Sequence, residues 1–140
     1  YKAFFFDSIR AVLGPEGTIL VPTFSYTIGR SLASEPAVFD PLNTKSETGP
    51  FTDFFRQQTG VSRSLDPMVS VSGIGPGFKK LITDLPPTSY GADSIFDRLT
   101  KTNAKICNIG LGTNWIPFLH HADWLSKVSY RYDKLFFGEI

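Results

Sequence analysis

A histidine and a carboxylate near residue 120 have the spacing of an acid–base pair. His120 and Asp123 stand three positions apart, which on a helix places both side chains on one face. A carboxylate in that position can orient the imidazole and stabilise its protonated form, as a general base requires. A purely structural pair on a helix surface has the same spacing, so the pattern leaves both interpretations open. The adjacent His121 points in another direction on a helix, which disfavours a zinc site.

A second polar group surrounds a turn after residue 62. Arg63 and Asp66 flank a loop that leads through Pro67 into a predicted strand. From the local sequence we expect Asp66 to cap the turn before Pro67. We also expect Arg63 to pair with Asp66 at the surface of the protein.

The sequence context of two further features favours a structural role over chemistry. Gly73, Gly75 and Gly77 resemble part of a phosphate-binding loop, but Pro76 removes an amide donor, so a turn is the favoured interpretation. Cys107 is the single cysteine, which excludes an internal disulfide. It lies in an apolar run, where we expect a buried, unreactive side chain. A lone cysteine is compatible with a reducing cytoplasm, where we place the protein.

Apolar periodicity predicts the elements that must position these residues. Predicted strands alternate with predicted helices, and the first strand is wholly apolar, as in a sheet buried on both faces. We therefore expect an α/β fold: a single domain with a mixed sheet and helices on its faces. Residues 23–50 form a long polar loop whose aromatic residues indicate that it is ordered. The predicted helices are 1–13, 51–58, 78–85, 94–102 and 118–128, and the predicted strands are 18–21, 68–74, 104–111 and 129–137.

The composition excludes several classes of protein. With 140 residues, of which 41% are hydrophobic and 19% charged, the chain can build a packed core and is not a disordered segment. The sequence contains no apolar run long enough to cross a membrane. A net charge of +1 gives no reason to expect a nucleic-acid or membrane partner, and we predict no metal site.

The order of several short motifs resembles the antibiotic N-acetyltransferase family, typified by the aminoglycoside 3-N-acetyltransferases. The resemblance covers nearly the whole chain with consistent spacing. Its motifs are residues 13–18 (LGPEGT), 21–24 (VPTF), 39–41 (FDP) with Ser46 and Gly49, 63–71 (RSLDPMVSV), 109–112 (IGLG), 119–123 (LHHAD) and 130–132 (YRY).

This resemblance implies an enzyme that takes acetyl-coenzyme A as co-substrate and acetylates an amino group of an aminoglycoside or another amino sugar. Antibiotic resistance would be one outcome of such a reaction. Family members are longer than this chain. Residues 1–140 would therefore be the central part of one acetyltransferase domain, with N- and C-terminal portions missing. Its partners would be a small-molecule amino sugar and coenzyme A.

The resemblance also implies which residues are catalytic. His120 would be the base, Asp123 its orienting partner, and Asp66 a contact for the substrate ammonium or an alternative base. His120 and Asp66 would then converge on one pocket. In the family's motif, histidines stand at the positions of Asp66 and Val69, and the later histidine is the presumed base. Valine cannot accept a proton, which favours a divergent member acting on another amino sugar.

Binding roles follow from the same resemblance. Ser70 and Val71 would lie along the pantetheine arm of the coenzyme, and Thr23 and Phe24 would form part of the substrate pocket wall. The main alternative is a catalytically inactive descendant that binds a sugar or the coenzyme. A third possibility is an acyltransferase that uses another acyl donor or a hydroxyl acceptor.

Overall fold

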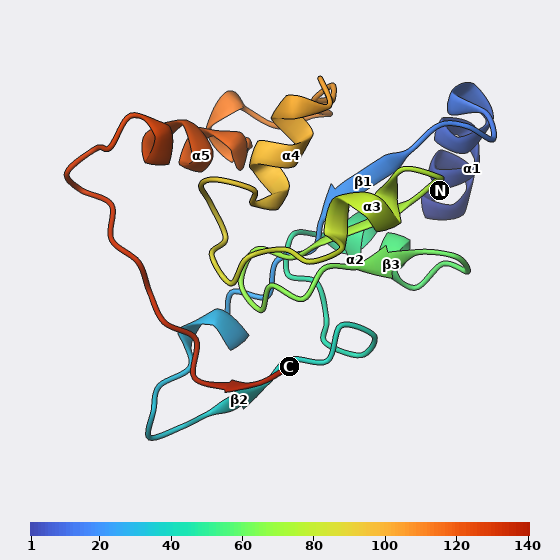
Figure 1. Ribbon diagram of the computed structural model, residues 1–140. Helices are drawn as coiled ribbons and strands as arrows, with labels where there is room; N and C mark the ends of the chain where they lie inside the picture. The colour runs from blue at the N-terminus through green and yellow to red at the C-terminus, as the bar shows by residue number, and fades with distance from the viewer. The chain divides into compact units, whose positions relative to one another are not determined.

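A computed structural model describes residues 1–140 apart from Gly29 and Asn114. Contacts within the chain divide it into two compact units, residues 1–82 with 135–140, and residues 83–134. Among the described residues, no helix is both long and apolar enough to span a bilayer. The first unit (Figure 1) contains α1 (Lys2–Leu13), β1 (Ile19–Pro22), the 3₁₀ helix η1 (Ile28–Arg30), β2 (Ala37–Val38), α2 (Pro50–Arg56), β3 (Ser62–Arg63), β4 (Val71–Ile74), α3 (Phe78–Ile82) and β5 (Gly138–Glu139). The second unit contains α4 (Ile95–Lys101), the 3₁₀ helix η2 (Thr113–Trp115) and α5 (Phe118–Leu125).

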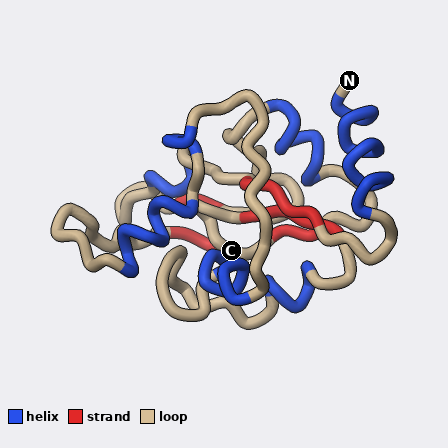
Figure 2. Tube along the Cα trace, turned by 90° about the horizontal axis from the view of Figure 1, so that it is seen from above, coloured by secondary structure: helices blue, strands red, loops and turns tan.

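The first unit is organised around a three-stranded antiparallel sheet in the order β1-β4-β3. Strand β1 pairs with β4 from Ile19 opposite Ile74 to Pro22 opposite Val71. Figure 2 shows these short strands in red within a chain that is mostly loop. Because β1 and β4 run in opposite directions, the end of β1 meets the start of β4. The residues just beyond those two strand ends are therefore brought together.

Helix α2 packs against this sheet, and α1 packs against α2. The contact between the helices is aromatic. The ring centroid of Phe6 lies 5.4 Å from that of Phe55, and Phe5 lies 4.9 Å from Phe51, both edge to face. The Phe55 side chain is completely buried. These phenylalanines therefore fix the two helices against each other and over the sheet.

A second, two-stranded sheet joins β2 to β5 in parallel. Ala37 stands opposite Gly138 and Val38 opposite Glu139. The Ala37 amide also donates a hydrogen bond of 3.0 Å to the Phe137 carbonyl. This short pairing ties the last residues of the chain to the loop that follows β1.

The second unit is built around α4 and α5, which contact each other. Ser94 caps α4, since its hydroxyl accepts a hydrogen bond from the Asp97 amide at 3.4 Å. The buried ring of Phe96 stacks on Tyr90 at 5.1 Å and meets Phe118 of α5 edge to face at 5.2 Å. This aromatic cluster forms the core of the unit together with the buried Ile95 and Leu99 of α4.

The predicted α/β composition and all five predicted helices are confirmed, with helix ends that differ by a few residues. The larger sheet is wholly antiparallel, and among the described strands parallel pairing occurs only between β2 and β5. The predicted strands at 104–111 and 129–137 are wrong, because within the described chain no residue of either segment belongs to a strand, and β5 begins only at Gly138. Cys107 is exposed, so the prediction of a buried thiol is also wrong. The segment around Cys107 belongs to neither of the sheets that the described residues form, so no neighbouring strand covers the thiol.

Candidate functional site

The residues at the facing ends of β1 and β4 form a buried hydroxyl network. Thr23 follows β1 and Ser70 precedes β4, and the Thr23 amide donates to the Ser70 carbonyl at 2.9 Å. The Thr23 hydroxyl lies 3.0 Å from the hydroxyl of Ser72. All three side chains have no exposed surface. They satisfy one another where water does not reach, as buried polar groups must.

The guanidinium of Arg63 is buried beside this network. Its Nε donates to Ser70 Oγ at 3.0 Å and its Nη2 donates to Ser25 Oγ at 2.8 Å. The same guanidinium donates to the carbonyls of Thr23 and Thr44. Burial lowers the pKa of Arg63 to about 10, so the side chain is still a cation at neutral pH. One side chain thus connects both strand ends and the long loop between them.

The prediction that Arg63 pairs with Asp66 at the surface is wrong. The Arg63 side chain extends inward, and its Cζ lies 4.9 Å above the centroid of the Phe39 ring. The cap predicted for Asp66 is confirmed, because its Oδ1 accepts from the amides of Met68 at 2.9 Å and Val69 at 2.8 Å. Asp66 is half-buried, and its role as a catalytic carboxylate stays a prediction.

The four residues expected to contact coenzyme or substrate are interior residues in this structure. Thr23 and Ser70 have no exposed surface, Val71 is 2% exposed and Phe24 is 5% exposed. The Val71 amide donates to the hydroxyl of Ser64 at 3.0 Å. These residues shape the strand ends from within, and direct contact with a ligand at Ser70, Val71, Thr23 or Phe24 stays a prediction.

In the second unit, a guanidinium lies where the sequence predicted a His–Asp contact. Arg131 Nη2 contacts His120 Nδ1 and also donates to Asp123 Oδ2 at 2.7 Å. Asp123 Oδ1 accepts from the hydroxyl of Tyr130 at 3.0 Å. Within the described chain no hydrogen bond joins His120 to Asp123. Asp123 thus binds Arg131 in this structure, and its role as the orienting partner of His120 stays a prediction.

The charges of this cluster shift its protonation equilibria. The pKa of His120 is lowered, first by partial burial and then by the positive charge of Arg131, while Asp123 opposes the shift. The hydrogen bond from Arg131 lowers the pKa of Asp123. The bond to that carboxylate raises the pKa of Tyr130. At neutral pH the cluster therefore contains a neutral imidazole beside an ion pair.

Sequence reasoning assigned no role to the neighbouring His121. Its side chain is 3% exposed, and its Nδ1 accepts from the Gly91 amide at 3.5 Å. Its Nε2 is buried with no hydrogen-bond partner among the described residues. The ring stacks near Phe96, with 6.5 Å between centroids. His121 is thus a core residue of the aromatic cluster, as its position three residues after Phe118 on α5 allows.

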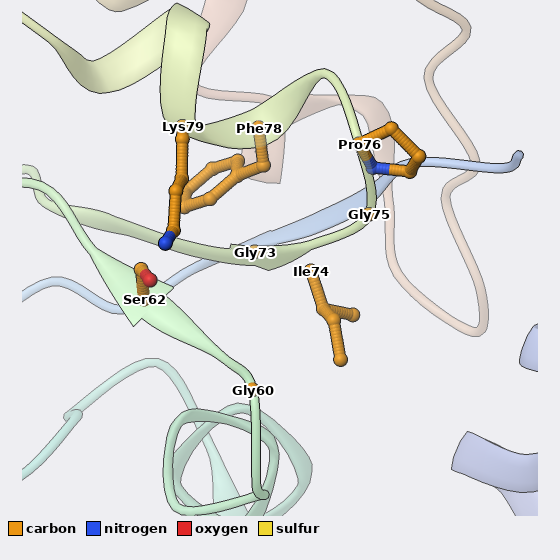
Figure 3. A pocket seen from close by; sticks show the side chains of 8 residues that line it. All are labelled: Gly60, Ser62, Gly73, Ile74, Gly75, Pro76, Phe78 and Lys79. Atoms are coloured by element: carbon orange, nitrogen blue, oxygen red, sulfur yellow. The ribbon is translucent and has the colours of Figure 1, made fainter.

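A small pocket lies beside β4 in the first unit. Figure 3 shows the Phe78 ring and the Lys79 side chain over the strand, with Ile74 directed to its other side. A Cβ at Gly75, where φ is +124°, would lie 2.4 Å from the Gly17 carbonyl oxygen, which supports the predicted turn. The pocket has a volume of about 230 Å³, which is below the usual 300–1,000 Å³ of ligand sites. It could therefore hold only a small chemical group. The lining residues are Gly60, Ser62, Gly73, Ile74, Gly75, Pro76, Phe78 and Lys79.

Comparisons with known proteins agree on one family. A family model described as aminoglycoside 3-N-acetyltransferase matches residues 2–136. Aminoglycoside N(3)-acetyltransferase IV from Salmonella sp. is 30% identical over an alignment of 127 residues, and the match covers 89% of this chain and 46% of the relative. This chain thus spans about half the length of the curated relatives that it matches.

Solved structures show the same similarity. AAC-IIIb in a binary complex with CoASH is 25% identical with a TM-score of 0.77, over 89% of this chain and 52% of that one. A mutant of the aminoglycoside acetyltransferase AAC(3)-IVa in complex with apramycin is 26% identical with a TM-score of 0.79. That match covers 92% of this chain and 50% of the other.

Proposed function

Since this chain belongs to the aminoglycoside 3-N-acetyltransferase family, we propose that it is part of an enzyme that acetylates an amino sugar. The acetyl group would come from acetyl-coenzyme A, and the acceptor would be an amino group of an aminoglycoside or a related compound. The observation that carries this proposal is the family match over residues 2–136. The coenzyme and apramycin complexes of similar structures support it.

We further propose that residues 1–140 belong to the central part of one acetyltransferase domain. The chain covers 46% and 51% of the length of its curated relatives, which supports this assignment. The reaction would take place in the cytoplasm, where the exposed thiol of Cys107 stays reduced.

The chemistry sets what the site must supply. An ammonium has no lone pair, so a base must take a proton before the amine attacks the thioester carbonyl. The tetrahedral oxyanion that follows needs hydrogen-bond donors. Asp66 and His120 are the titratable residues that we propose for this chemistry. Ser70, Val71, Thr23 and Phe24 would line the coenzyme and substrate pockets by way of the main chain at the strand ends.

The test is release of free coenzyme A thiol from acetyl-coenzyme A in the presence of a panel of aminoglycosides and simpler amino sugars. Thiol release that depends on one acceptor, with a mass gain of one acetyl group on that acceptor, would support the proposal. No acceptor-dependent release across the panel would contradict it. Heat-unfolded protein serves as the control for spontaneous thioester hydrolysis.

One observation favours a second candidate, a catalytically inactive descendant that binds the sugar or the coenzyme. Val69 stands where the family motif carries a histidine, and its side chain is only 6% exposed. If the protein is an enzyme, Val69→His should be neutral or mildly activating. If natural protein releases no thiol but Val69→His creates acceptor-dependent release, the chain is a binding protein that has lost its base.

A further inference from the structure

We propose that Arg131 is a positioning residue that holds His120 with its proton on Nε2. His120 then serves as a hydrogen-bond donor to an oxygen of the bound substrate, and not as the base. The tautomer follows from the geometry of this chain alone. The second part, donation to a substrate oxygen, rests on the proposed function.

The contact of Arg131 with His120 determines which nitrogen carries the proton. A guanidinium has five N–H donors and no acceptor. Arg131 Nη2 faces His120 Nδ1, so Nδ1 must present its lone pair. A neutral imidazole carries one proton, which is then on Nε2. In this state the outer nitrogen of His120 can donate a hydrogen bond but cannot accept a proton.

Asp123 holds the guanidinium in that position. Its Oδ2 accepts from Arg131 Nη2 at 2.7 Å and from Arg131 Nε at 3.1 Å, while Tyr130 occupies Oδ1 at 3.0 Å. In a Ser–His–Asp triad the carboxylate instead accepts from Nδ1–H and stabilises the imidazolium. Here the order of the groups is carboxylate, guanidinium, imidazole, which reverses the electrostatic effect on His120.

The groups around His120 keep it uncharged. Partial burial and then the charge of Arg131 lower its pKa, and Asp123 opposes them. The Tyr90 ring packs edge to face against the imidazole, with 5.7 Å between centroids. His120 is exposed, in contrast to His121. No hydrogen bond to His120 Nε2 occurs within the described part of the chain. Its N–H is therefore available to a substrate oxygen, and Asp66 is the remaining candidate base among the predicted residues.

The tautomer is tested by nitrogen NMR of the imidazole rings, which needs no substrate. The chain has only two histidines. His120→Gln removes the imidazole signals of one of them, which assigns the signals of both. We expect His120 to carry its proton on Nε2 at neutral pH and to titrate below the ordinary value of about 6.5. In Arg131→Met the titration midpoint should rise, and an Nδ1–H form facing Asp123 should appear.

Lys134→Met is the matched control, because it removes an exposed positive charge near Arg131 in the sequence, and in the described part of the chain Lys134 forms no hydrogen bond with His120. It should leave the His120 midpoint unchanged. An Nδ1–H form in the wild-type protein, or a wild-type midpoint at or above the ordinary value, would overturn the proposal. So would an unchanged midpoint in a folded Arg131→Met protein. The wild-type spectrum decides the question even if that variant does not fold.

The donor role is tested by comparing His120→Ala with His120→Gln in the thiol-release assay. Glutamine has an N–H donor but no basic group. A lost neutral hydrogen bond corresponds to a rate decrease of about 2- to 13-fold, and we expect that loss for alanine and a smaller one for glutamine. Equal losses of about 10²–10⁴-fold in both variants are typical of a missing base and would refute the donor role. If wild-type protein releases no thiol, the proposed function fails, while the NMR result still decides the tautomer.

Discussion

Replacing Gly73 with alanine should destabilise the protein, because the Phe78 ring occupies the space of a side chain at this position of β4 (Figure 3). A Cβ at Gly73 would lie 2.3 Å from Phe78 Cδ2 and 2.4 Å from Cε2. Carbon atoms pack at about 3.5–4.0 Å. The ring or the strand must therefore move by roughly 1.2 Å or more, although Phe78 is only 1% exposed.

The expected change in the free energy of unfolding follows from two opposing effects. Overpacking a core costs about 1–3 kcal/mol. Alanine recovers about 0.4–1 kcal/mol because it restricts the unfolded chain more than glycine does. We therefore expect a net destabilisation of about 1–2 kcal/mol, measured by urea unfolding followed by circular dichroism.

Two variants isolate the contact. Gly77→Ala is the matched control, because its Cβ would meet only Thr18 Oγ1, at 3.3 Å, and we expect little change in stability. Phe78→Leu removes part of the ring and should relieve the clash. The double variant should then show a coupling energy of about 0.5–3 kcal/mol. The packing argument is refuted if Gly73→Ala is as stable as wild type, or if the two substitutions are simply additive.

Three further predictions concern other contacts. Arg63→Met should lower the free energy of unfolding by about 2 kcal/mol, because lost hydrogen bonds to a charged group are worth about 1.5–3 kcal/mol each. The variant no longer buries a cation, which offsets part of this loss. An unchanged urea midpoint would contradict the prediction. Gly91→Ala should destabilise the second unit by at least about 1 kcal/mol, since φ of Gly91 is +105° and the new Cβ would lie 2.7 Å from Trp124. The same contact should alter tryptophan fluorescence. Unchanged emission and stability would argue against the contact. The pKa of Asp123 is lowered in the folded protein, so in acid the unfolded chain binds more protons than the folded one. The contribution of the Asp123–Arg131 pair to the free energy of unfolding should therefore be complete above the ordinary carboxyl range and lost as pH falls through the lowered pKa. A carbon NMR titration of Asp123 should show its midpoint rising in Arg131→Met, and equal midpoints would show that Arg131 is not the cause.

The helices could be predicted because their signals are local. The apolar residues of α1 recur at helical spacing and end at Gly14, which has a φ of +69°. Ser94 stands at the N-terminus of α4 and caps it. The turn at Asp66 could be predicted for the same reason, since its carboxylate bonds amides only two and three positions ahead.

The errors concern contacts with distant residues. The run from Ala104 to Leu111 is apolar enough for a strand, but a strand forms only where a neighbour pairs with it. The spacing of His120 and Asp123 correctly predicted that both lie on one helix. Arg131, which follows that helix in the chain, contacts both side chains in place of a direct His120–Asp123 hydrogen bond. Its permanently charged, forked guanidinium binds a carboxylate better than an imidazole does. Arg63 was expected at the surface because nothing in the local sequence shows that distant carbonyls would enclose it.

The parallel pairing of β2 with β5 has a consequence for the order of folding. It closes a loop from Ala37 to Gly138, and the entropy of closing about 100 residues is worth roughly 4 kcal/mol. The two inter-strand hydrogen bonds, with net energies of about 0.5–1.5 kcal/mol each, together supply only about 1–3 kcal/mol, which is less than that cost. Strand β5 should therefore dock late and detach first, and the amides of Ala37 and Phe39, which donate to Phe137 and Glu139, should exchange with solvent earlier than the amides of β4. Each detachment therefore frees the last residues described here from the loop at residues 37–39 without disturbing the pairing of β1 with β4.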